Sequence, residues 1–462
     1  MEKKFTRLLS IELCGFKNVN YGKIDMPNFA SKQFDALSSE IMGIYGQNGS
    51  GKTAVIEALS FLKTLLLGDP LPNNTVNYIN VNSNATVLTF KFLISTIGLK
   101  GIVDYKIGFS KTQDNKVVID TERIDFAKFG EEKIQSKITL IGYDRTLDKV
   151  SYFPKYRYEE FSFGAKDVDI QIGVAENVSL KECKSLVFCE EMRPIWKKAE
   201  EKDPAWFAIT NTLRNFAVES LFVVKNDHNG AITLDFAIPV AFKYVDKEHL
   251  IAGDMLVSLV EPTVFEEKLF AIFKQIIDEA NPVVSSLIPG LVIDIKEYGP
   301  QLTKDGKNGV RFELISNRNG KRIPLLYESE GVKKILSIIN LLIGVYNNSS
   351  FCVAIDELDA GVYEYLLGEL LSVINETGKG QLVFTSHNLR PLELINKTSM
   401  RFTTTNPDNR YIKLTSVGNS NNLRDLYIRS INLGGQKEQI YEPTKEHEIR
   451  RAFRKAGKPI DE

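Results

Sequence analysis

Cysteine, histidine and tryptophan are scarce in this sequence. The 462 residues include four cysteines, four histidines and two tryptophans. No two cysteines form a Cys-x-x-Cys pair and no histidine stands at metal-ligand spacing from them, so we expect neither a structural zinc site nor a disulfide framework. Cys14 and Cys352 lie inside apolar runs, which indicates buried thiols in a reducing compartment.

The chain also lacks a charge excess and a long apolar run. Lys and Arg (58) nearly balance Asp and Glu (59), so no overall basic field attracts nucleic acid or an anionic membrane, and DNA contact would need a local patch. The longest apolar run, Ile335–Tyr346, is shorter than the roughly 18 residues of a membrane span. Glu12 interrupts the apolar stretch that follows Lys3, Lys4 and Arg7, which argues against a signal peptide. We therefore expect a cytoplasmic protein without a membrane segment.

Internal repeats, low-complexity tracts and long heptad patterns are absent from the sequence, which excludes a solenoid and coiled-coil arms. A length of 462 residues instead allows two or three compact units, at roughly 100–200 residues each.

The first part of the chain predicts strands and one helix. Leu8–Leu13 is expected to be a strand, and the short apolar run Ile41–Tyr45 leads into a Gly-rich segment. Ala54–Leu67 carries apolar residues at helical spacing. Four segments rich in Val, Ile, Phe and Tyr then predict an antiparallel sheet of hairpins: Thr86–Phe92, Ile102–Phe109, Val117–Ile124 and Ile138–Tyr143.

The rest of the chain predicts a helical middle and an α/β end. The pattern from about Arg145 to Asn281 is mostly helical, and Val264–Ala280 is its clearest amphipathic helix. A hairpin turned by Asn319-Gly320 follows, made of Val310–Ile315 and Lys321–Leu325. The last unit has continuously apolar strands, as expected for parallel strands buried on both faces: helix Gly331–Tyr346, strand Phe351–Asp356, helix Ala360–Glu376 and strand Gln381–Thr385.

The segment Gly46-Gln-Asn-Gly-Ser-Gly-Lys52-Thr53 matches the P-loop pattern GxxxxGK[ST] at every fixed position, between a predicted strand and a predicted helix. Its glycines let backbone N–H groups turn toward phosphate oxygens, and the helix N-terminus adds its dipole. We expect Lys52 to reach the β- and γ-phosphates of ATP, and the Thr53 hydroxyl to bind Mg²⁺. The residues predicted to contact the nucleotide here are Gly46, Asn48, Gly49, Ser50, Gly51, Lys52 and Thr53.

An apolar strand that ends in two carboxylates, Phe351-Cys-Val-Ala-Ile-Asp356-Glu357, matches the Walker B pattern. Asp356 is expected to hold Mg²⁺ and Glu357 to polarise the attacking water. Alone, such a pattern is as often a strand that meets a solvated loop. Together with the P-loop it predicts a Mg²⁺-dependent ATPase.

Asp356 lies 304 residues after Lys52, far more than one strand–helix–strand crossover needs. A long insertion therefore splits one nucleotide-binding unit. This arrangement resembles the RecF/SMC/OLD branch of the ABC ATPases, which implies an α/β head whose mixed sheet carries an antiparallel β-subdomain. The expected units are an N-terminal ATPase lobe (1–143), a mainly helical insertion (144–300) and a C-terminal ATPase lobe (301–462).

The predicted helix that precedes the Walker B strand begins with Glu328-Ser329-Glu330-Gly331-Val332-Lys333. ABC ATPases carry the signature LSGGQ at this place. Ser329 and Gly331 match its Ser and second Gly, while Glu330 and Val332 depart from it. The resemblance implies that Ser329 and Gly331 bind the γ-phosphate held by a second protomer, in a homodimer or higher homo-oligomer. The alternative is that Ser329 is only a helix N-cap.

Two further loops match the family. Asp359 resembles the D-loop residue at the dimer interface, and the resemblance places it near the nucleotide. His387, 30 residues after Glu357, resembles the H-loop histidine that contacts the γ-phosphate, with an ordinary surface histidine as the alternative. Leu433-Gly434-Gly435-Gln436 also looks like a signature, but it follows Walker B and so stands in the wrong order.

The closest motif resemblance is to the abortive-infection ATPases of the AbiL type. It rests on the Glu-Ser-x-Gly-x-Lys motif, on Asp104-Tyr-Lys-Ile-Gly-Phe and on Ile119-Asp-Thr-Glu-Arg-Ile. It implies an anti-phage ATPase that senses infection and controls a separate nuclease or toxin, since Met400–Glu462 lacks the acidic metal cluster of the Toprim nuclease in OLD proteins. The alternatives are a RecF-like DNA repair ATPase, which the near-zero charge disfavours, and an ATP-locked scaffold, which Glu357 and His387 disfavour.

Overall fold

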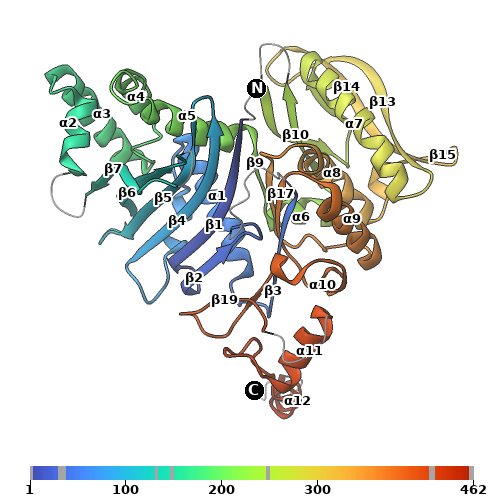
Figure 1. Ribbon diagram of the computed structural model, residues 1–462. Coiled ribbons are helices and arrows are strands. Elements are labelled where there is room, and N and C mark those ends of the chain that lie inside the picture. The colour runs from blue at the N-terminus through green and yellow to red at the C-terminus, as the bar shows by residue number, and fades with distance from the viewer. Residues whose placement is uncertain are drawn as a thin grey trace, which may run out of the picture.

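The computed structural model describes residues 4–29, 38–130, 134–145, 150–245, 250–415 and 422–456. Two large sheets lie side by side, and helices pack between and around them (Figure 1). The predicted α/β class, with a mixed sheet and an antiparallel subdomain, is confirmed.

The first sheet has seven antiparallel strands in the order β2-β1-β4-β5-β6-β7-β8. The hairpins predicted from the Val, Ile, Phe and Tyr clusters are confirmed, and the first strand is longer than Leu8–Leu13. Its strands are β1 (Phe5–Phe16), β2 (Val19–Asp25), β4 (Ala85–Thr96), β5 (Leu99–Lys111), β6 (Val117–Lys128), β7 (Ile138–Asp144) and β8 (Ser151–Phe153).

The second sheet has six strands in the order β19-β18-β3-β17-β16-β9, parallel except for the β18–β19 pair. Every residue of β3, β16 and β17 is buried, as predicted for parallel strands covered on both faces. The strands are β3 (Glu40–Tyr45), β9 (Leu221–Val224), β16 (Cys352–Ile355), β17 (Gln381–Thr385), β18 (Met400–Thr403) and β19 (Tyr411–Ile412).

Helices cover both faces of the six-stranded sheet. Helix α1 (Lys52–Leu67) packs between the two large sheets with α5 (Ala205–Glu219), in one core that contains side chains from both sheets. Helices α8 (Glu330–Asn347) and α9 (Glu364–Thr377) cover the opposite face. Helix α9 begins at Glu364 and not at the predicted Ala360, because Glu357–Val362 form turns that include a left-handed Gly361 (φ 74°).

The middle of the chain is not helical throughout. It contains the expected helices α2 (Lys155–Ser162), α3 (Lys166–Glu182), α4 (Arg193–Ala199), α5, α6 (Asn226–Thr233) and α7 (Glu267–Leu287). Unpredicted strands alternate with them: β8, β9, β10 (Ala237–Val245), β11 (Leu250–Ser258) and β12 (Thr263–Glu266). Strand β9 is a short apolar run, which periodicity alone cannot distinguish from a piece of buried helix.

Helix α7 begins later than the predicted Val264. Residues Thr263–Glu266 pair with β14 (Asn308–Arg318) as strand β12, so the helix starts at Glu267 and continues to Leu287. Strand β14 also pairs with β13 (Leu291–Leu302) and β15 (Lys321–Pro324). The hairpin at Asn319-Gly320 is confirmed, and both residues have the positive φ (51° and 84°) that this turn requires.

The middle segment does not pack on itself alone. Helices α2–α5 share a core with the seven-stranded sheet, while α7 and strands β10–β14 share another core with α8. The unit boundaries at 143/144 and 300/301 stay predictions. Within the described residues, no helix is both long and apolar enough to cross a membrane.

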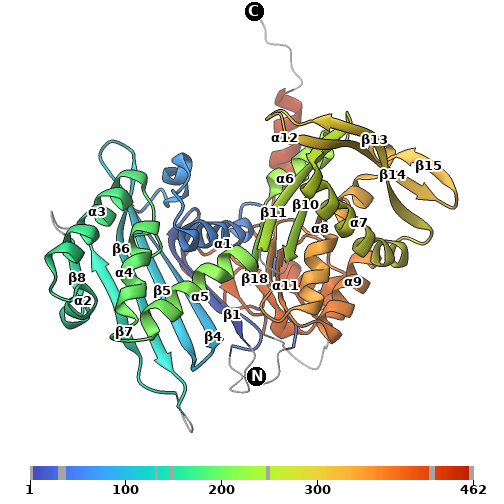
Figure 2. The same ribbon diagram turned by 90° about the horizontal axis from the view of Figure 1, so that it is seen from above.

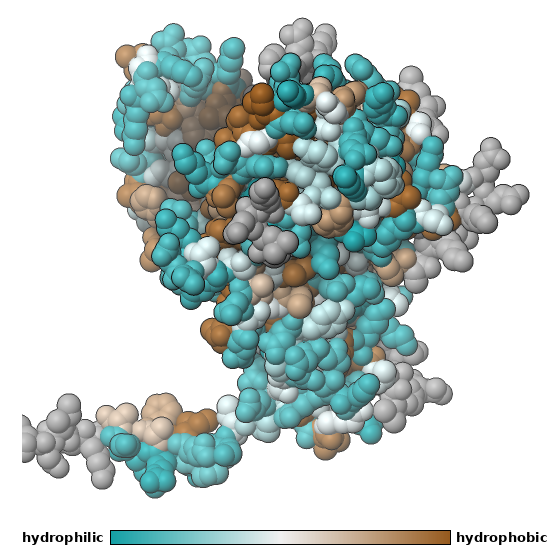
Figure 3. Space-filling model, turned by 90° about the vertical axis from the view of Figure 1, so that its left-hand side faces the viewer, coloured by the Kyte–Doolittle hydropathy of each residue, from teal (hydrophilic) through white to brown (hydrophobic). Residues whose placement is uncertain are grey.

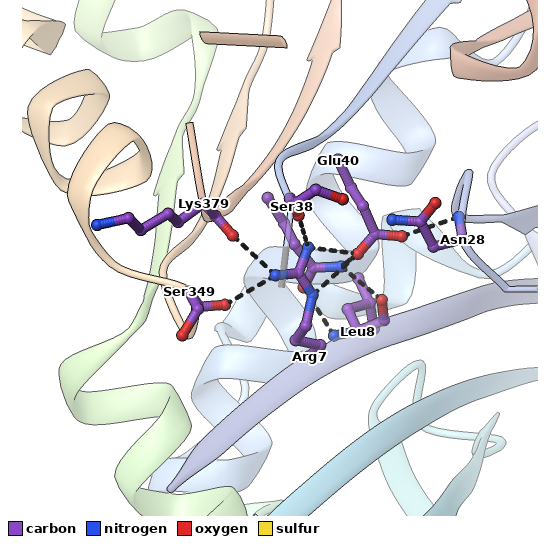
Figure 4. Close-up of polar contacts among 8 residues, drawn as sticks. Arg7, Leu8, Asn28, Ser38, Glu40, Ser349 and Lys379 are labelled. Carbon is purple, nitrogen blue, oxygen red and sulfur yellow. Dashed lines mark hydrogen bonds and ion pairs between the residues drawn. The ribbon is translucent and has the colours of Figure 1, made fainter. Parts of the chain in front are cut away.

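A buried polar junction ties the two large sheets together (Figure 4). Arg7 of β1 forms an ion pair with Glu40 of β3, at 2.6 Å between Nη2 and Oε2, and also donates to the Lys379 carbonyl. Gln381 of β17 donates to Glu40 Oε2 and to the Leu8 carbonyl. Both charges are almost fully buried, so their dense hydrogen bonding offsets the cost of desolvation. The junction fixes the amino end of β3. The carboxyl end of β3 leads into the P-loop.

Candidate nucleotide-binding site

The P-loop lies between β3 and α1, as predicted. Its backbone is left-handed at Gly49 (φ 75°) and Gly51 (φ 94°), conformations that favour glycine. At Gly46 an added Cβ would lie 1.7 Å from Thr403 Oγ1, so a side chain has no room there. The loop therefore folds as a cradle of backbone groups at the N-terminus of α1, the arrangement that binds phosphate.

Lys52 lies inside this cradle. Its side chain is 7% exposed, and Nζ donates to the carbonyls of Gly46 (3.0 Å) and Gln47 (3.1 Å). Burial lowers the pKa of Lys52, and the carboxylates of Asp356 and Glu357 act in the opposite direction. The ammonium thus stands where it can meet phosphate oxygens.

The amino end of α1 meets the carboxyl ends of β16 and β17 beside Lys52. Thr53 Oγ1 lies 3.3 Å from Asp356 Oδ1, and Thr385 Oγ1 donates to the same oxygen at 2.6 Å. Hydroxyl and carboxylate oxygens are the ligands that Mg²⁺ prefers. No group of three His, Cys, Asp or Glu side chains in the described ranges could hold a metal ion alone. The site therefore fits a Mg²⁺ ion that is also held by nucleotide phosphates.

Glu357 follows in a strained turn. Its φ is 49°, a left-handed conformation that is uncommon for a non-glycine residue, and its N–H donates to Thr385 Oγ1 at 2.8 Å. The side chain is partly exposed. Non-glycine residues in this conformation cluster at functional sites, which agrees with the role predicted for Glu357.

Thr385 is a site residue that sequence reasoning missed. Its hydroxyl donates to Asp356 and accepts from the Glu357 N–H, so one side chain holds the Asp356 carboxylate and the Glu357 backbone. Thr385 ends β17, directly before Ser386 and the predicted His387. That strand end was the only available signal.

Lys334 was also missed. It lies in the second turn of α8, is 2% exposed, and burial lowers its pKa to about 8. The carboxylates of Asp356 and Glu357 raise that pKa, so the ammonium lies within electrostatic reach of the Walker B end. The pair Lys333-Lys334, directly before the apolar run Ile335–Tyr346, was the sequence signal.

Asp359 and His387 are held together within one chain. Asp359 Oδ2 accepts from the backbone N–H groups of His387 (3.0 Å) and Asn388 (2.9 Å). The His387 side chain is exposed at the same edge. The predicted D-loop carboxylate thus shapes the predicted H-loop, and its buried Oδ1 has no hydrogen-bond partner in the described structure.

Ser329 caps α8, and its Oγ accepts from the Val332 N–H at 3.4 Å. A Cβ on Gly331 would lie 2.2 Å from the Gly361 carbonyl oxygen, so close packing against the turn after Walker B demands glycine. Among the described residues, no hydrogen bond joins Ser329 to the P-loop of its own chain. The interpretation of Ser329 as a helix N-cap is therefore compatible with the structure. Ser329 and the neighbouring Glu330 are exposed to solvent.

Residues far from the P-loop in sequence form hydrogen bonds with it. Tyr411 Oη donates to the Gly51 carbonyl at 2.8 Å, and Thr403 Oγ1 lies 2.5 Å from Ser50 Oγ. Gln47 forms a reciprocal pair with the Glu442 backbone, through Glu442 N–H to Oε1 (2.9 Å) and Nε2 to the carbonyl (3.4 Å). These contacts span more than 350 residues of sequence, and no local pattern signals them.

A cavity of about 620 Å³ opens beside the P-loop. Its wall includes Lys52 and Thr53 and a group of asparagines, Asn18, Asn20, Asn77, Asn80 and Asn82. The volume lies in the range of small-molecule and cofactor sites. Asn18, in the turn between β1 and β2, donates to the Gly49 carbonyl, so this turn contacts the P-loop.

Comparison with known proteins gives one family match. Residues 10–215 match an AAA domain, less than half of the chain. A search of curated proteins finds no match. The matched range includes the P-loop, and the match agrees with the geometry of a P-loop nucleotide-binding domain.

Solved structures show remote likeness, each at 11% identity. One is an Smc head bound to the C-winged helix domain of ScpA (TM-score 0.40; 88% of this chain and 98% of that chain). Another is the Smc head domain with an extended coiled coil bound to the C-terminal domain of ScpA derived from Pyrococcus furiosus (0.40; 89% and 96%). A third is the SMC head domain from Thermotoga maritima (0.38; 89% and 100%).

Proposed function

We propose that this chain is a Mg²⁺-dependent ATPase that acts as an ATP-closed dimer in a bacterial anti-phage system of the abortive-infection kind. One observation carries the ATPase part. Thr53 of the P-loop and Asp356 of Walker B, 303 residues apart in sequence, have their oxygens 3.3 Å apart.

The roles of the side chains follow from this geometry. Lys52 offsets the phosphate charge, and Thr53 and Asp356 hold Mg²⁺, which would stabilise the charge that develops on the phosphoryl oxygens. Glu357 orients and polarises the attacking water. Thr385 fixes the backbone of Glu357 through its hydroxyl. The nucleoside occupies the asparagine-lined cavity, where amide groups offer donors and acceptors to the base and ribose.

The dimer part concerns Ser329 and Gly331. Ser329 is exposed at the N-terminus of α8, where helix N–H groups favour an anion. We assign this surface to the γ-phosphate bound by a second protomer, so that each nucleotide is closed by two chains across a two-fold axis. His387 is assigned to the γ-phosphate as the H-loop histidine.

The shared site can be tested by mixing inactive variants. Ser329→Arg should abolish hydrolysis and spare ATP binding at the P-loop, because it adds bulk only where the second protomer closes. Mixing Ser329→Arg with Lys52→Ala chains gives mixed dimers with one intact site, so part of the ATPase activity should return. A Ser329→Arg chain that hydrolyses ATP normally would show that Ser329 is only a helix cap.

The defence role is supported by the AbiL-like motifs and by residues that a passive scaffold does not need, Glu357 and His387. We propose that hydrolysis loosens the dimer and releases a separate nuclease or toxin. A plaque assay would test it, in cells that carry the gene with its genomic neighbours. Wild type should lower phage plating and Lys52→Ala should not. Equal plating in both would refute the defence role, and rescue of DNA-damage sensitivity would favour the RecF-like alternative.

A further inference from the structure

Helix α12 (Glu446–Ala456) is an amphipathic helix whose apolar face is open in the described part of the chain. None of its residues is buried, and Phe453 is 78% and Ile449 43% exposed. Ile449, Ala452, Phe453 and Ala456 stand at the i, i+3, i+4, i+7 spacing of one helix face. Figure 3 shows the projecting segment at lower left with brown residues on one side and teal on the other. Figure 1 shows α12 at the bottom of the molecule below the sheets, and Figure 2 shows it at the upper edge of the view from above.

An isolated helix of 11 residues is only marginally stable in water. Intrahelical ion pairs, such as Arg450 with Glu446, add little at an exposed surface. A helix with this apolar face is therefore expected to gain most of its stability from a surface that covers Ile449 and Phe453.

The origin of α12 places it beside the nucleotide site. The chain before it is anchored through Ile440, which is buried, and through Glu442, whose backbone pairs with Gln47 of the P-loop. From Glu442 to Ala456 every residue is exposed. The helix thus starts four residues after a direct P-loop contact, on the edge of the molecule that binds the nucleotide.

A complementary surface surrounds the Ser329 region. Tyr327 (73% exposed) and Tyr363 (68%) flank the exposed carboxylates of Glu330 and Glu364, and these four residues form what we call the acidic–aromatic patch. Gly361, two residues before Tyr363, lies against Glu330, since a Cβ on Gly361 would lie 3.5 Å from the Glu330 Cβ. The segments that carry the two halves of the patch are therefore neighbours. Neither carboxylate has an ion-pair partner in the part of the chain that the structure describes.

The charges of the two surfaces are opposite. Helix α12 carries two glutamates and four basic residues, Arg450, Arg451, Arg454 and Lys455. The apolar face of α12 can bury against the two exposed tyrosines of the patch. The arginines of α12 can form cation–π contacts with these tyrosines and charged hydrogen bonds with the two carboxylates.

We infer that α12 docks on the acidic–aromatic patch of a second copy of this chain. The inference rests on the proposed function, in which the P-loop of one protomer faces Ser329 of the other. That geometry brings α12, tethered beside the P-loop, to the partner's copy of the patch around Ser329. Docking would stabilise the closed dimer, and we call this contact between α12 and the patch the clamp. The Gln47–Glu442 contact connects the segment before α12 to the P-loop.

The first measurement is the dimer dissociation constant with ATP and Mg²⁺, by sedimentation in the Glu357→Gln background. Phe453→Asp should weaken the dimer about tenfold or more, since each dimer loses two apolar contacts. Leu433→Asp is the matched control, because Leu433 is also 78% exposed but lies on α11 (Leu423–Leu433), outside α12 and the patch. It should leave the constant unchanged.

The second measurement distinguishes docking between chains from docking within one chain. One tagged chain carries Phe453→Cys and a differently tagged chain carries Tyr363→Cys. Both have Cys14 changed to Ser, because Cys14 is exposed and not buried as its apolar surroundings in the sequence predicted. ATP should promote a disulfide between the two tags. Ile97→Cys, 77% exposed between β4 and β5, replaces Tyr363→Cys as the control and should not react.

Each outcome decides a different point. If the Glu357→Gln chain dimerises with ATP and the added Phe453→Asp change leaves the dissociation constant the same, the clamp is wrong and the proposed dimer stands, with α12 left for another occupant. The absence of an ATP-promoted disulfide between the two tags also overturns the clamp. A Glu357→Gln chain that stays monomeric with ATP and Mg²⁺ refutes the proposed dimer itself.

Discussion

Thr385 offers the sharpest test of the candidate site. It is fully buried, donates to Asp356 Oδ1 at 2.6 Å and accepts from the Glu357 N–H at 2.8 Å. Thr385→Val keeps the shape of the side chain and removes both hydrogen bonds. The Glu357 N–H then loses this acceptor, and Asp356 loses one of two hydroxyl neighbours.

The expected magnitudes follow from these two bonds. Loss of a hydrogen bond to a charged group together with an unsatisfied N–H should lower the free energy of unfolding by about 2–4 kcal/mol. Residues that orient metal ligands contribute about 10–100-fold to metal affinity or activity. We therefore expect Thr385→Val to lower kcat for ATP hydrolysis by about 10–100-fold at saturating ATP, with a higher Mg²⁺ requirement.

Two controls separate positioning from general destabilisation. Thr385→Ser keeps the hydroxyl, so its kcat should stay within about threefold of wild type. This decrease is smaller than the roughly 10–100-fold decrease in kcat expected when the positioning hydroxyl is lost. Thr86→Val removes another fully buried hydroxyl, which donates to the Gly15 carbonyl at 2.6 Å in the seven-stranded sheet, and should lower stability without changing kcat. If Thr385→Val keeps wild-type kcat and Mg²⁺ dependence, Thr385 does not position the Walker B carboxylates.

Four further substitutions have defined outcomes. Lys52→Ala should abolish ATP binding by isothermal titration, and undiminished affinity would refute the P-loop assignment. Glu357→Gln should keep ATP bound and slow turnover by about 10²–10⁴-fold in a phosphate-release assay; hydrolysis near the wild-type rate would exclude it as the base. Lys334→Met should lower the Mg²⁺ concentration for half-maximal activity, because a buried cation near the carboxylates is removed; an unchanged requirement would contradict this. Arg7→Met leaves Glu40 buried without its ion pair. It should lower the free energy of unfolding, measured by chemical denaturation, by about 3–5 kcal/mol. A decrease below about 1 kcal/mol is the value of a surface ion pair and would contradict the buried pair's role.

The features that the sequence determined by itself are local ones. The P-loop, the Walker B strand and the hairpin at Asn319-Gly320 each depend on residue types at fixed short spacing. Glycine tolerates positive φ, continuous apolar runs mark strands buried on both faces, and Asn-Gly favours one turn. These rules act over a few residues, so they could be applied without knowing the rest of the chain. The helices α1 and α8 followed from periodicity for the same reason.

The tertiary structure decided the features that depend on which segments meet. Strand β9 joins the six-stranded sheet beside β16, although its four residues lie amid helices in sequence. Thr385 and Tyr411 reach the site only because β17 and β19 lie in the same sheet as β3. Strand pairing is non-local, since backbone hydrogen bonds form between whichever strands packing brings together, and no short pattern encodes the choice. The exposed face of α12 is likewise visible only in the structure, because amphipathic spacing predicts an apolar face but not whether anything covers it.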